Sequence, residues 1–382
     1  MNNPDFVRQT SGTLADSTTR HPLWWQIHAD LPLVAGLVAL CIFGLFVLFS
    51  ASDGDQSIVT RQAMIMLVGM MTMLVVGQLN VQFLRRHASS IYLAGLGMLG
   101  LVLIIGVEEN GARSWIDLPG LPSFQPSEMM KFIVPLLLAS YLSRRQLPPR
   151  FLQLLIAALL ILVPVALVVL QNDTGTAIMV FMSGVFALLL AGIRWGIVLS
   201  GLFTLLLASP AWYFFLAQEH QKNRILTFFD PYRDPTGAGY NIIQSQIAIG
   251  SGGVHGKGYG NGAQSHLDFI PESNTDFILA VLAEELGLLG VLFLIGLYLF
   301  VLARGFFIAY IVKDMFSRLL AGSITLTFFL YVFVNMAMVS GLLPVIGLPL
   351  PLISRSGTSI LTLFIGFGLL MSLQRHGRSP SS

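Results

Sequence analysis

Ionisable side chains lie beside or inside long apolar segments of this sequence. Asp276 directly precedes one apolar run, and Glu128 and Lys131 stand three residues apart in another. Residues three apart share one face of a helix, so Glu128 and Lys131 can form an ion pair there. Ionisable groups at membrane depth are costly and tend to mark function. Burial at the start of a span should raise the pKa of Asp276 and make its carboxylate a stronger base. A carboxylate that only favours a helix N-terminus is the alternative.

Further polar residues could bind an anionic substrate. Arg113 has the planar guanidinium that binds phosphates through paired hydrogen bonds, or it anchors the chain at the membrane surface. Asp173, in the short turn between two apolar runs, either caps the turn or contacts a substrate. Lys257 either meets a phosphate or stays in solvent. Glu284 and Glu285 lie deeper in an apolar run, where pairing with a basic residue of another helix is the expected structural role.

The stretch 250–262 is rich in glycine but does not fit a nucleotide-binding loop. The phosphate-loop pattern places glycine five residues before its Gly-Lys pair and Ser or Thr after it. Here these positions hold Ser251 and Gly258. The stretch is either a flexible surface loop or one whose backbone N–H groups approach a phosphate. The single cysteine, Cys41, and the spacing of His255 and His266 give no metal-ligand pattern. We therefore assign no metal and no cofactor, and a bound divalent cation stays an open alternative.

The elements that must position these residues are membrane-spanning helices. Hydrophobic residues make up 55% of the 382-residue chain and charged residues 10%, and the mean hydropathy is +0.77. Soluble domains carry roughly 25% charged residues, and a span needs roughly 20 apolar residues. We predict an all-α, polytopic integral membrane protein with about ten transmembrane helices, at 31–50, 62–79, 91–107, 128–142, 152–171, 174–192, 196–217, 277–303, 316–340 and 359–373. The 277–303 segment is long enough to be tilted or broken.

The chain divides into a transmembrane domain, 31–375, and two short tails, 1–30 and 376–382. One large loop, 218–275, interrupts the transmembrane domain. Lys and Arg in short loops favour the cytoplasmic side. With the N-terminus inside, that side collects Arg85, Arg86, Arg144, Arg145, Arg150, Arg194, Arg304, Lys313, Arg318, Arg375 and Arg378. Both termini are therefore predicted to be cytoplasmic and the large loop to face outward. The formal net charge of +2 does not indicate a nucleic-acid partner.

Five motifs occur in order along the chain and resemble the SEDS family (shape, elongation, division and sporulation). They are 111–115, 124–131, 230–253, 275–287 and 339–351, and the resemblance covers roughly 30–375. It implies a peptidoglycan glycosyltransferase that polymerises lipid II at the outer face of the bacterial inner (cytoplasmic) membrane. It also implies a class B penicillin-binding protein and other elongation-complex proteins as partners. Leu282-Ala283 before the two glutamates, and the run from Leu343, resemble the rod-shape branch more than the division branch.

The resemblance implies that Asp276 is the catalytic base and that Glu128 and Lys131 belong to the catalytic cavity. This fits the chemistry, because a sugar hydroxyl needs a base while a lipid pyrophosphate leaves without a strong acid. A flippase or transporter of the lipid-linked precursor is the first alternative function. A non-catalytic scaffold for the penicillin-binding protein is the second.

The sequence departs from the family pattern in two places. Around Asp173 the family usually has proline where Asn172 stands and leucine at the position after the aspartate. In the loop before the last span, Arg355 and Ser356 replace an aromatic residue and a glycine. The extra charge, and a residue with less backbone freedom than glycine, can give this loop another shape. Ser354, in the same loop, is carried over from the resemblance as a substrate-binding residue.

Overall fold

The structure is a computed structural model that describes residues 30–109, 112–117, 123–215, 217, 219–234, 237–262 and 272–378. Apart from Asp30, the predicted N-terminal tail lies outside the described residues, as do His266 and the last four residues of the chain. Helix α14 continues to Arg378, so the first residues of the predicted C-terminal tail are helical.

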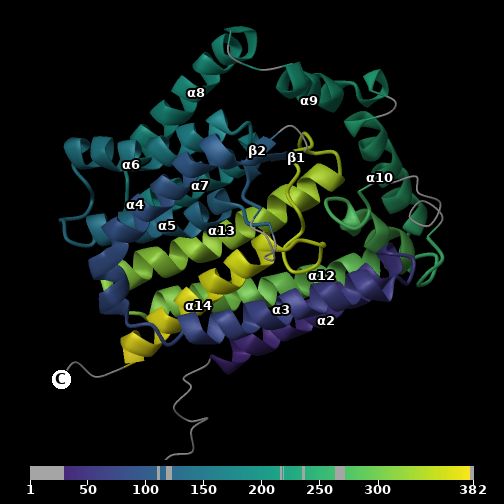
Figure 1. The fold of residues 1–382 in the computed structure, drawn as a ribbon, viewed down its shortest axis with the longest axis horizontal. Coiled ribbons are helices and arrows are strands. Elements are labelled where there is room, and N and C mark those ends of the chain that lie inside the picture. Colours follow the sequence, from purple (N-terminus) through teal and green to yellow (C-terminus); the bar gives the residue numbers. More distant parts are fainter. Residues whose placement is uncertain are drawn as a thin grey trace, which may run out of the picture.

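All ten predicted segments are helices (Figure 1). They are α2 (Leu31–Ala51), α3 (Gln56–Val76), α4 (Val81–Ile105), α5 (Pro126–Leu142), α6 (Phe151–Leu170), α7 (Thr174–Leu190), α8 (Trp195–Phe215), α12 (Ile278–Ile311), α13 (Met315–Val339) and α14 (Thr358–Arg378). Within the described residues, eight of them are long and apolar enough to cross a membrane. Helices α5 and α7 have 17 residues each. The all-α polytopic fold is confirmed, and the number of ten spans stays a prediction.

Two helices begin well before the apolar runs that predicted them. Helix α3 starts after Asp55 and α4 after Asn80, and each of these side chains accepts a hydrogen bond from a backbone N–H two residues further on. Such N-caps satisfy N–H groups that have no partner inside the helix. The helix start is therefore set by the capping residue, whereas hydropathy detects only the apolar part of the helix.

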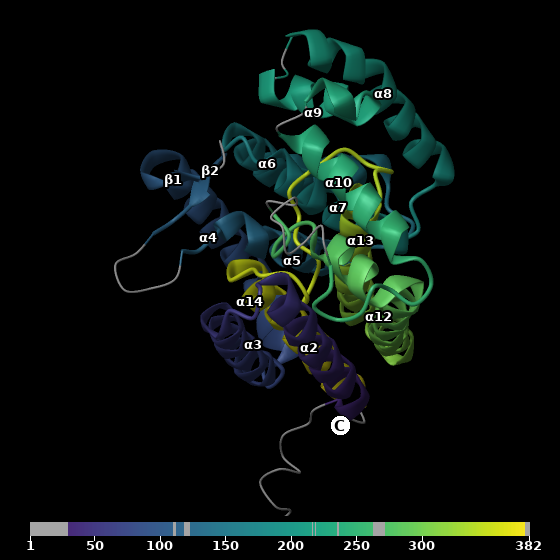
Figure 2. The same ribbon diagram turned by 90° about the vertical axis from the view of Figure 1, so that its right-hand side faces the viewer.

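Helices α5, α7, α13 and α14 surround the interior of the molecule (Figures 1 and 2). In an apolar stretch of 18 residues, 72% of the residues of α13 and 83% of those of α14 are buried. By contrast, no described side chain of α8 is buried, and this helix stands at the edge of the bundle. Polar groups buried in α13 and α14 must therefore find partners inside the protein.

One end of the bundle gathers residues that the charge pattern places on the cytoplasmic side. Arg304 donates to both carboxylate oxygens of Asp30, at 2.8 and 2.5 Å. Arg375 donates to the side chain of Gln78, and Arg85 pairs with Asp314. These contacts join the start of α2 to the C-terminal part of α12, the end of α14 to the end of α3, and the start of α4 to the start of α13. These helix ends therefore lie on a common side of the bundle, and its assignment to the cytoplasm stays a prediction.

The large loop 218–275 contains helices α9 (Glu219–Phe229) and α10 (Ala238–Gly252), joined through the 3₁₀ turn η1 (Pro231–Arg233). Helix α10 packs against α12. The described part of the loop 218–275 is therefore folded, and its helix α10 packs on the helical bundle.

Before α5, two short strands, β1 (Val107–Glu109) and β2 (Ala112–Trp115), form an antiparallel hairpin that the sequence analysis did not predict.

Helix α12 is broken at Gly287, where φ is 66° and ψ is −162°. The glycine-rich loop fills the break. The N–H groups of Lys257 and Gly258 donate to the carbonyls of Glu284 and Glu285 before the break, each at 3.0 Å. The N–H groups of the two residues after Gly287 donate to the carbonyls of residues 253 and 254. The loop thus satisfies the backbone groups that a broken helix leaves without partners.

Glycine is required for this close approach. A Cβ atom at Gly256, where φ is 77°, would stand 2.1 Å from the carbonyl oxygen of Glu285. A Cβ atom at Gly252 would stand 1.9 Å from the carbonyl oxygen of Ala283. The stretch lies at the surface, with Val254 and Tyr259 exposed, but its backbone is packed and hydrogen-bonded where the chain meets α12.

Candidate functional site

Asp276 lies in the turn 272–277 that leads into α12, and the backbone of this turn is held from outside. The carbonyls of three consecutive residues each accept a hydrogen bond from a distant segment. Asn274 accepts from the N–H of Arg355 at 2.9 Å, and Thr275 from the hydroxyl of Ser354 at 2.5 Å. Asp276 accepts from the side-chain amide of Asn335 at 2.9 Å. The position of the turn is therefore fixed by α13 and by the 341–357 loop.

The carboxylate of Asp276 is largely withdrawn from solvent, with 9% of the residue exposed. Burial raises the pKa of Asp276 to about 7, and the charge and hydrogen bond of Glu272 add to this effect, while the positive charge of Arg224 opposes it. Gly347 lies against the carboxylate, because a Cβ atom there would be 3.6 Å from Oδ2. A carboxyl group with a pKa near neutral pH is well matched to general-base catalysis.

A buried cluster forms around Lys131 on α5. Its Nζ donates to Glu128 Oε1 at 2.5 Å and to the hydroxyl of Tyr331 at 2.8 Å. The Tyr331 hydroxyl in turn lies 3.2 Å from Glu128 Oε1 and 3.3 Å from the hydroxyl of Ser359. Thr362 on α14 donates to the second oxygen of Glu128. The expected ion pair on one face of a helix is present, and the pair is enclosed by groups from α13 and α14.

Asp173 begins α7 and caps it. Its Oδ1 accepts from the N–H of Thr176 at 2.9 Å, and its Oδ2 accepts from the side chain of Gln125 at 2.6 Å. Burial raises the pKa of Asp173, while its capping hydrogen bonds lower it. Asn172 has φ of 62°, a value that proline cannot adopt. The turn therefore differs in shape from one built on the family's usual proline.

Helix α13 connects the Asp276 turn with the lysine cluster. Asn335 holds the carbonyl of Asp276, and Tyr331, one turn earlier, contacts Lys131 and Glu128. Four residues along a helix correspond to about 6 Å. Asp173 joins the same neighbourhood, since its charge acts on Lys131. The fold thus brings three of the predicted site residues close together and ties Asp276 to them through one helix.

Arg113 does not join this neighbourhood in the structure. Its guanidinium donates to the carbonyls of Gly106 at 2.8 Å and Ile104 at 3.1 Å, at the C-terminal end of α4. Lys257 pairs with Glu284 at 2.6 Å, so its ammonium is engaged with α12. The basic partner of Glu284 thus comes from the glycine-rich loop and not, as expected, from another helix.

Ser354 and Glu285 also make internal contacts. The fully buried hydroxyl of Ser354 donates to Thr275 and accepts from the N–H of Leu350 at 2.8 Å. Glu285 accepts from the hydroxyl of Ser50 at 2.6 Å. Substrate contacts by Arg113, Lys257 and Ser354 stay predictions, and the structure gives each of these side chains a structural partner.

Several residues of the site were missed by the sequence analysis. Tyr331 and Asn335 lie inside an apolar run, and Glu272 and Arg224 lie in the large loop. A signal existed for Asn335, because a fully polar amide within a span needs a buried partner. No such signal marks Arg224, whose approach to Asp276 depends on how α9 folds back. Among the described residues, no group of three or more His, Cys, Asp or Glu could hold a metal ion.

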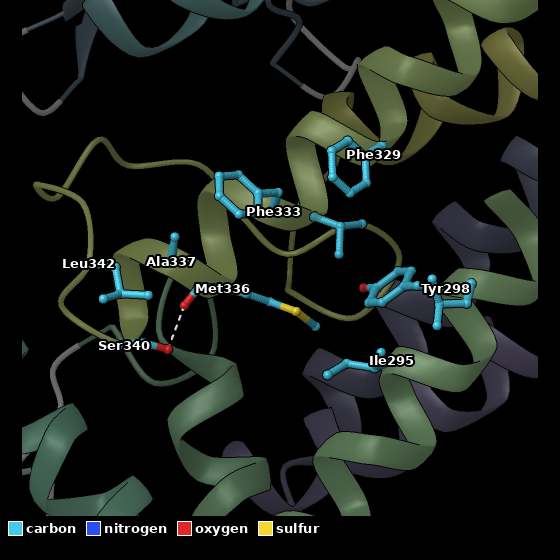
Figure 3. A pocket seen from close by; sticks show the side chains of 10 residues that line it. Ile295, Tyr298, Phe329, Phe333, Met336, Ala337, Ser340 and Leu342 are labelled. Atoms are coloured by element: carbon cyan, nitrogen blue, oxygen red, sulfur yellow. Dashed lines mark hydrogen bonds between the residues drawn. The ribbon is translucent and has the colours of Figure 1, made fainter.

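An apolar cavity of about 280 Å³ lies between α12 and α13 (Figure 3). Tyr298, Phe329 and Phe333 contribute to its lining, and Ser340 at its edge donates its hydroxyl to the carbonyl of Met336. None of the ionisable residues of the site lines it. This cavity can accommodate apolar groups but offers no acid, base or cation for chemistry.

The fold and the site together define a polytopic membrane protein with the desolvated carboxylate of Asp276 at one end of its helical bundle. The family model of cell cycle proteins that comprises FtsW, RodA and SpoVE matches residues 31–379. The chain therefore belongs to the SEDS family.

Curated relatives cover nearly the whole chain. The chain is 42% identical to the peptidoglycan glycosyltransferase MrdB of Escherichia coli K12, over 96% of this chain and 99% of the relative. It is 36% identical to the probable peptidoglycan glycosyltransferase FtsW of Geobacter sulfurreducens, over 90% and 94%. The expected likeness to the rod-shape branch is confirmed.

Solved structures resemble the whole fold. A chain from a peptidoglycan synthase complex that coordinates polymerization and crosslinking matches with a TM-score of 0.80 and 33% identity, over 92% of this chain and 99% of that one. The rod-shape-determining protein RodA of Thermus thermophilus matches with a TM-score of 0.72 and 30% identity, over 94% and 100%. The chain is thus a multi-pass bacterial membrane protein with the fold of these proteins.

Proposed function

We propose that this chain polymerises lipid II into glycan strands for cell elongation, with Asp276 as the general base. Its class, peptidoglycan glycosyltransferase, follows from the full-length similarity to relatives with that activity. The observation that carries the mechanism is the Asp276 carboxylate, which is 9% exposed, has a pKa of about 7 and lies in a turn held by three outside hydrogen bonds.

In the reaction, the Asp276 carboxylate takes the proton of the acceptor sugar hydroxyl as its oxygen attacks the anomeric carbon of the donor. The bond from that carbon to the lipid pyrophosphate breaks, and the pyrophosphate leaves with the electron pair. A pKa near 7 lets Asp276 accept the proton and then release it to water. Arg224, whose charge acts on Asp276, supplies positive charge beside this position and favours an anionic donor there.

The orientation supports this chemistry at the outer membrane face. The helix ends joined by Asp30–Arg304 and Arg85–Asp314 contacts carry the positive charge expected on the cytoplasmic side. Asp276 lies in the turn directly before α12 and Arg304 lies near the other end of that helix, so the two residues occupy opposite ends of it. Both termini are then cytoplasmic, and Asp276 meets a lipid-linked substrate on the outer side.

The partner is a class B penicillin-binding protein, which supplies crosslinking. The support is the fold shared with a chain of a synthase complex that couples polymerization to crosslinking. Other elongation-complex proteins belong to the same proposal. No nucleic-acid partner is proposed.

The test is polymerisation of purified lipid II by wild-type protein, Asp276→Asn and the control Asp117→Asn, each with and without the transpeptidase partner. Asp117 is exposed and lies outside the site. Wild type and control should make glycan polymer, and Asp276→Asn should make none. Equal product from Asp276→Asn and wild type would remove Asp276 from its role. A flippase predicts transport of the precursor without polymer, and a scaffold predicts that Asp276→Asn retains function in cells.

A further inference from the structure

A buried amide on α13 lies directly beside the Asp276 turn. Asn335 is fully buried, and its Nδ2 donates to the carbonyl of Asp276 at 2.9 Å and to the carbonyl of Leu348 at 2.7 Å. Its Oδ1 has no hydrogen-bond partner among the described residues. The reverse orientation would place Oδ1 against two carbonyl oxygens. Only one orientation of the amide therefore fits, and both of its donors are used to join two separate segments.

The two segments that Asn335 joins enclose the carboxylate. One carries Asp276 itself. The other is the chain around Gly347, which has φ of 81° and lies against Oδ2 of Asp276. Leu348, the residue that Asn335 holds, directly follows this glycine. The amide thus sets the spacing between the residue that carries the carboxylate and the segment that faces it.

We infer that Asn335 is a positioning residue for Asp276, whose amide holds the carboxylate turn against the Gly347 segment and so aims the carboxylate at the acceptor hydroxyl. This inference rests on the proposed function of Asp276 as the base. Asn335 itself touches no reacting atom, because its donors bind backbone carbonyls. Its effect on the reaction is transmitted entirely through the position and hydration of Asp276.

The direct test replaces the amide by an apolar side chain of similar size in Asn335→Leu. Both carbonyls then lose their donor, and the turn can separate from the Gly347 segment. Misplacement of a reacting group by about 1 Å costs on the order of 100-fold in rate. We expect kcat for lipid II polymerisation to fall at least about 10-fold, with KM nearly unchanged. Water that reaches the carboxylate should also move the acidic limb of the kcat/KM profile to lower pH.

The matched control is Thr327→Val on the same helix. The Thr327 hydroxyl is buried and donates to the carbonyl of Ser323 within α13, so it joins no other segment. This variant should keep both kcat and the acidic limb of the wild type. If Asn335→Leu does not fold, as judged by size-exclusion chromatography in detergent, Asn335→Ser removes at least one donor with a smaller change. Like Asn335→Leu, Asn335→Ser should lower kcat and move the acidic limb of the kcat/KM profile to lower pH.

The outcomes separate this inference from the proposed function. A fall in kcat together with an acidic limb at lower pH supports the positioning role. Unchanged kcat, or a fall without a shift of the limb, overturns it, because a general loss of structure would lower activity alone. Asp276→Asn is measured in parallel. Polymer from that variant would refute the base itself, whereas no polymer from it, with wild-type behaviour of the Asn335 variants, refutes only the positioning role.

Discussion

Replacing Asp276 by asparagine should remove activity and at the same time stabilise the protein at high pH. The carboxylate has a pKa of about 7 in the folded protein, against 3.8 for an ordinary aspartate. In the unfolded chain it ionises above pH 4, and in the folded chain only above pH 7. Between these values the folded state binds more protons, so the stability of the wild type falls as pH rises.

The size of this effect follows from the shift of about three pKa units. Each unit corresponds to about 1.4 kcal/mol, so the ionised carboxylate costs about 4 kcal/mol well above pH 7. Asparagine has no charge to desolvate and escapes this cost. The stability advantage of Asp276→Asn over wild type should therefore grow by about 2 kcal/mol between pH 5.5 and pH 8.5.

The assay is the free energy of unfolding of both proteins, measured by SDS titration in mixed micelles at the two pH values. Effects of other titrating groups are common to both proteins and cancel in the difference. A difference that stays constant between pH 5.5 and pH 8.5 would falsify the view that burial of this carboxylate governs its protonation. A wild type that gains stability relative to the variant at high pH would reverse the sign and refute the reasoning outright.

Other expectations concern the surroundings of this carboxylate and the packing of the loop. Glu272→Gln should move the acidic limb of kcat/KM to lower pH, because it removes a like charge near Asp276. Arg224→Gln should move the limb to higher pH, because it removes a positive charge. Shifts of both variants in the same direction would contradict the assignment of this limb to Asp276. Lys131→Met should lower the free energy of unfolding by about 3–5 kcal/mol, because it leaves a buried carboxylate without its cation, and a loss below about 1 kcal/mol would show that water reaches the pair. Gly256→Ala should destabilise by about 3 kcal/mol or more through overlap with α12 and positive φ. Gly250→Ala, in helix α10 with open space around it, should be neutral or slightly stabilising, so equal losses from both glycine variants would argue against the packed break.

The prediction of the helices succeeded because the membrane imposes a strong constraint on local composition. Backbone groups in lipid must be satisfied within the segment, so a long apolar run can only be a helix. The length of the segment after Asp276 predicted either a tilt or a break, and the structure has the break. The ends of α3 and α4 were not, because a polar cap such as Asp55 or Asn80 looks the same in a loop as at a helix start.

The site was predicted unevenly for a physical reason. Glu128 and Lys131 are three residues apart, and helix geometry alone decides that they meet. Arg113 and Lys257 carry the right charge for a phosphate, but their partners lie on other elements that local sequence does not specify.

The sequence by itself determined that this protein is a helical membrane protein and that Asp276 stands at the start of a long apolar helix. Those properties depend on composition and on contacts within one helix. Only the tertiary structure decided that Asn335 and Ser354 hold the aspartate turn, that Arg224 approaches it, and that the glycine-rich loop fills the break in α12. Each of these depends on hydrogen bonds or charges between segments far apart in the chain, which no local pattern can encode.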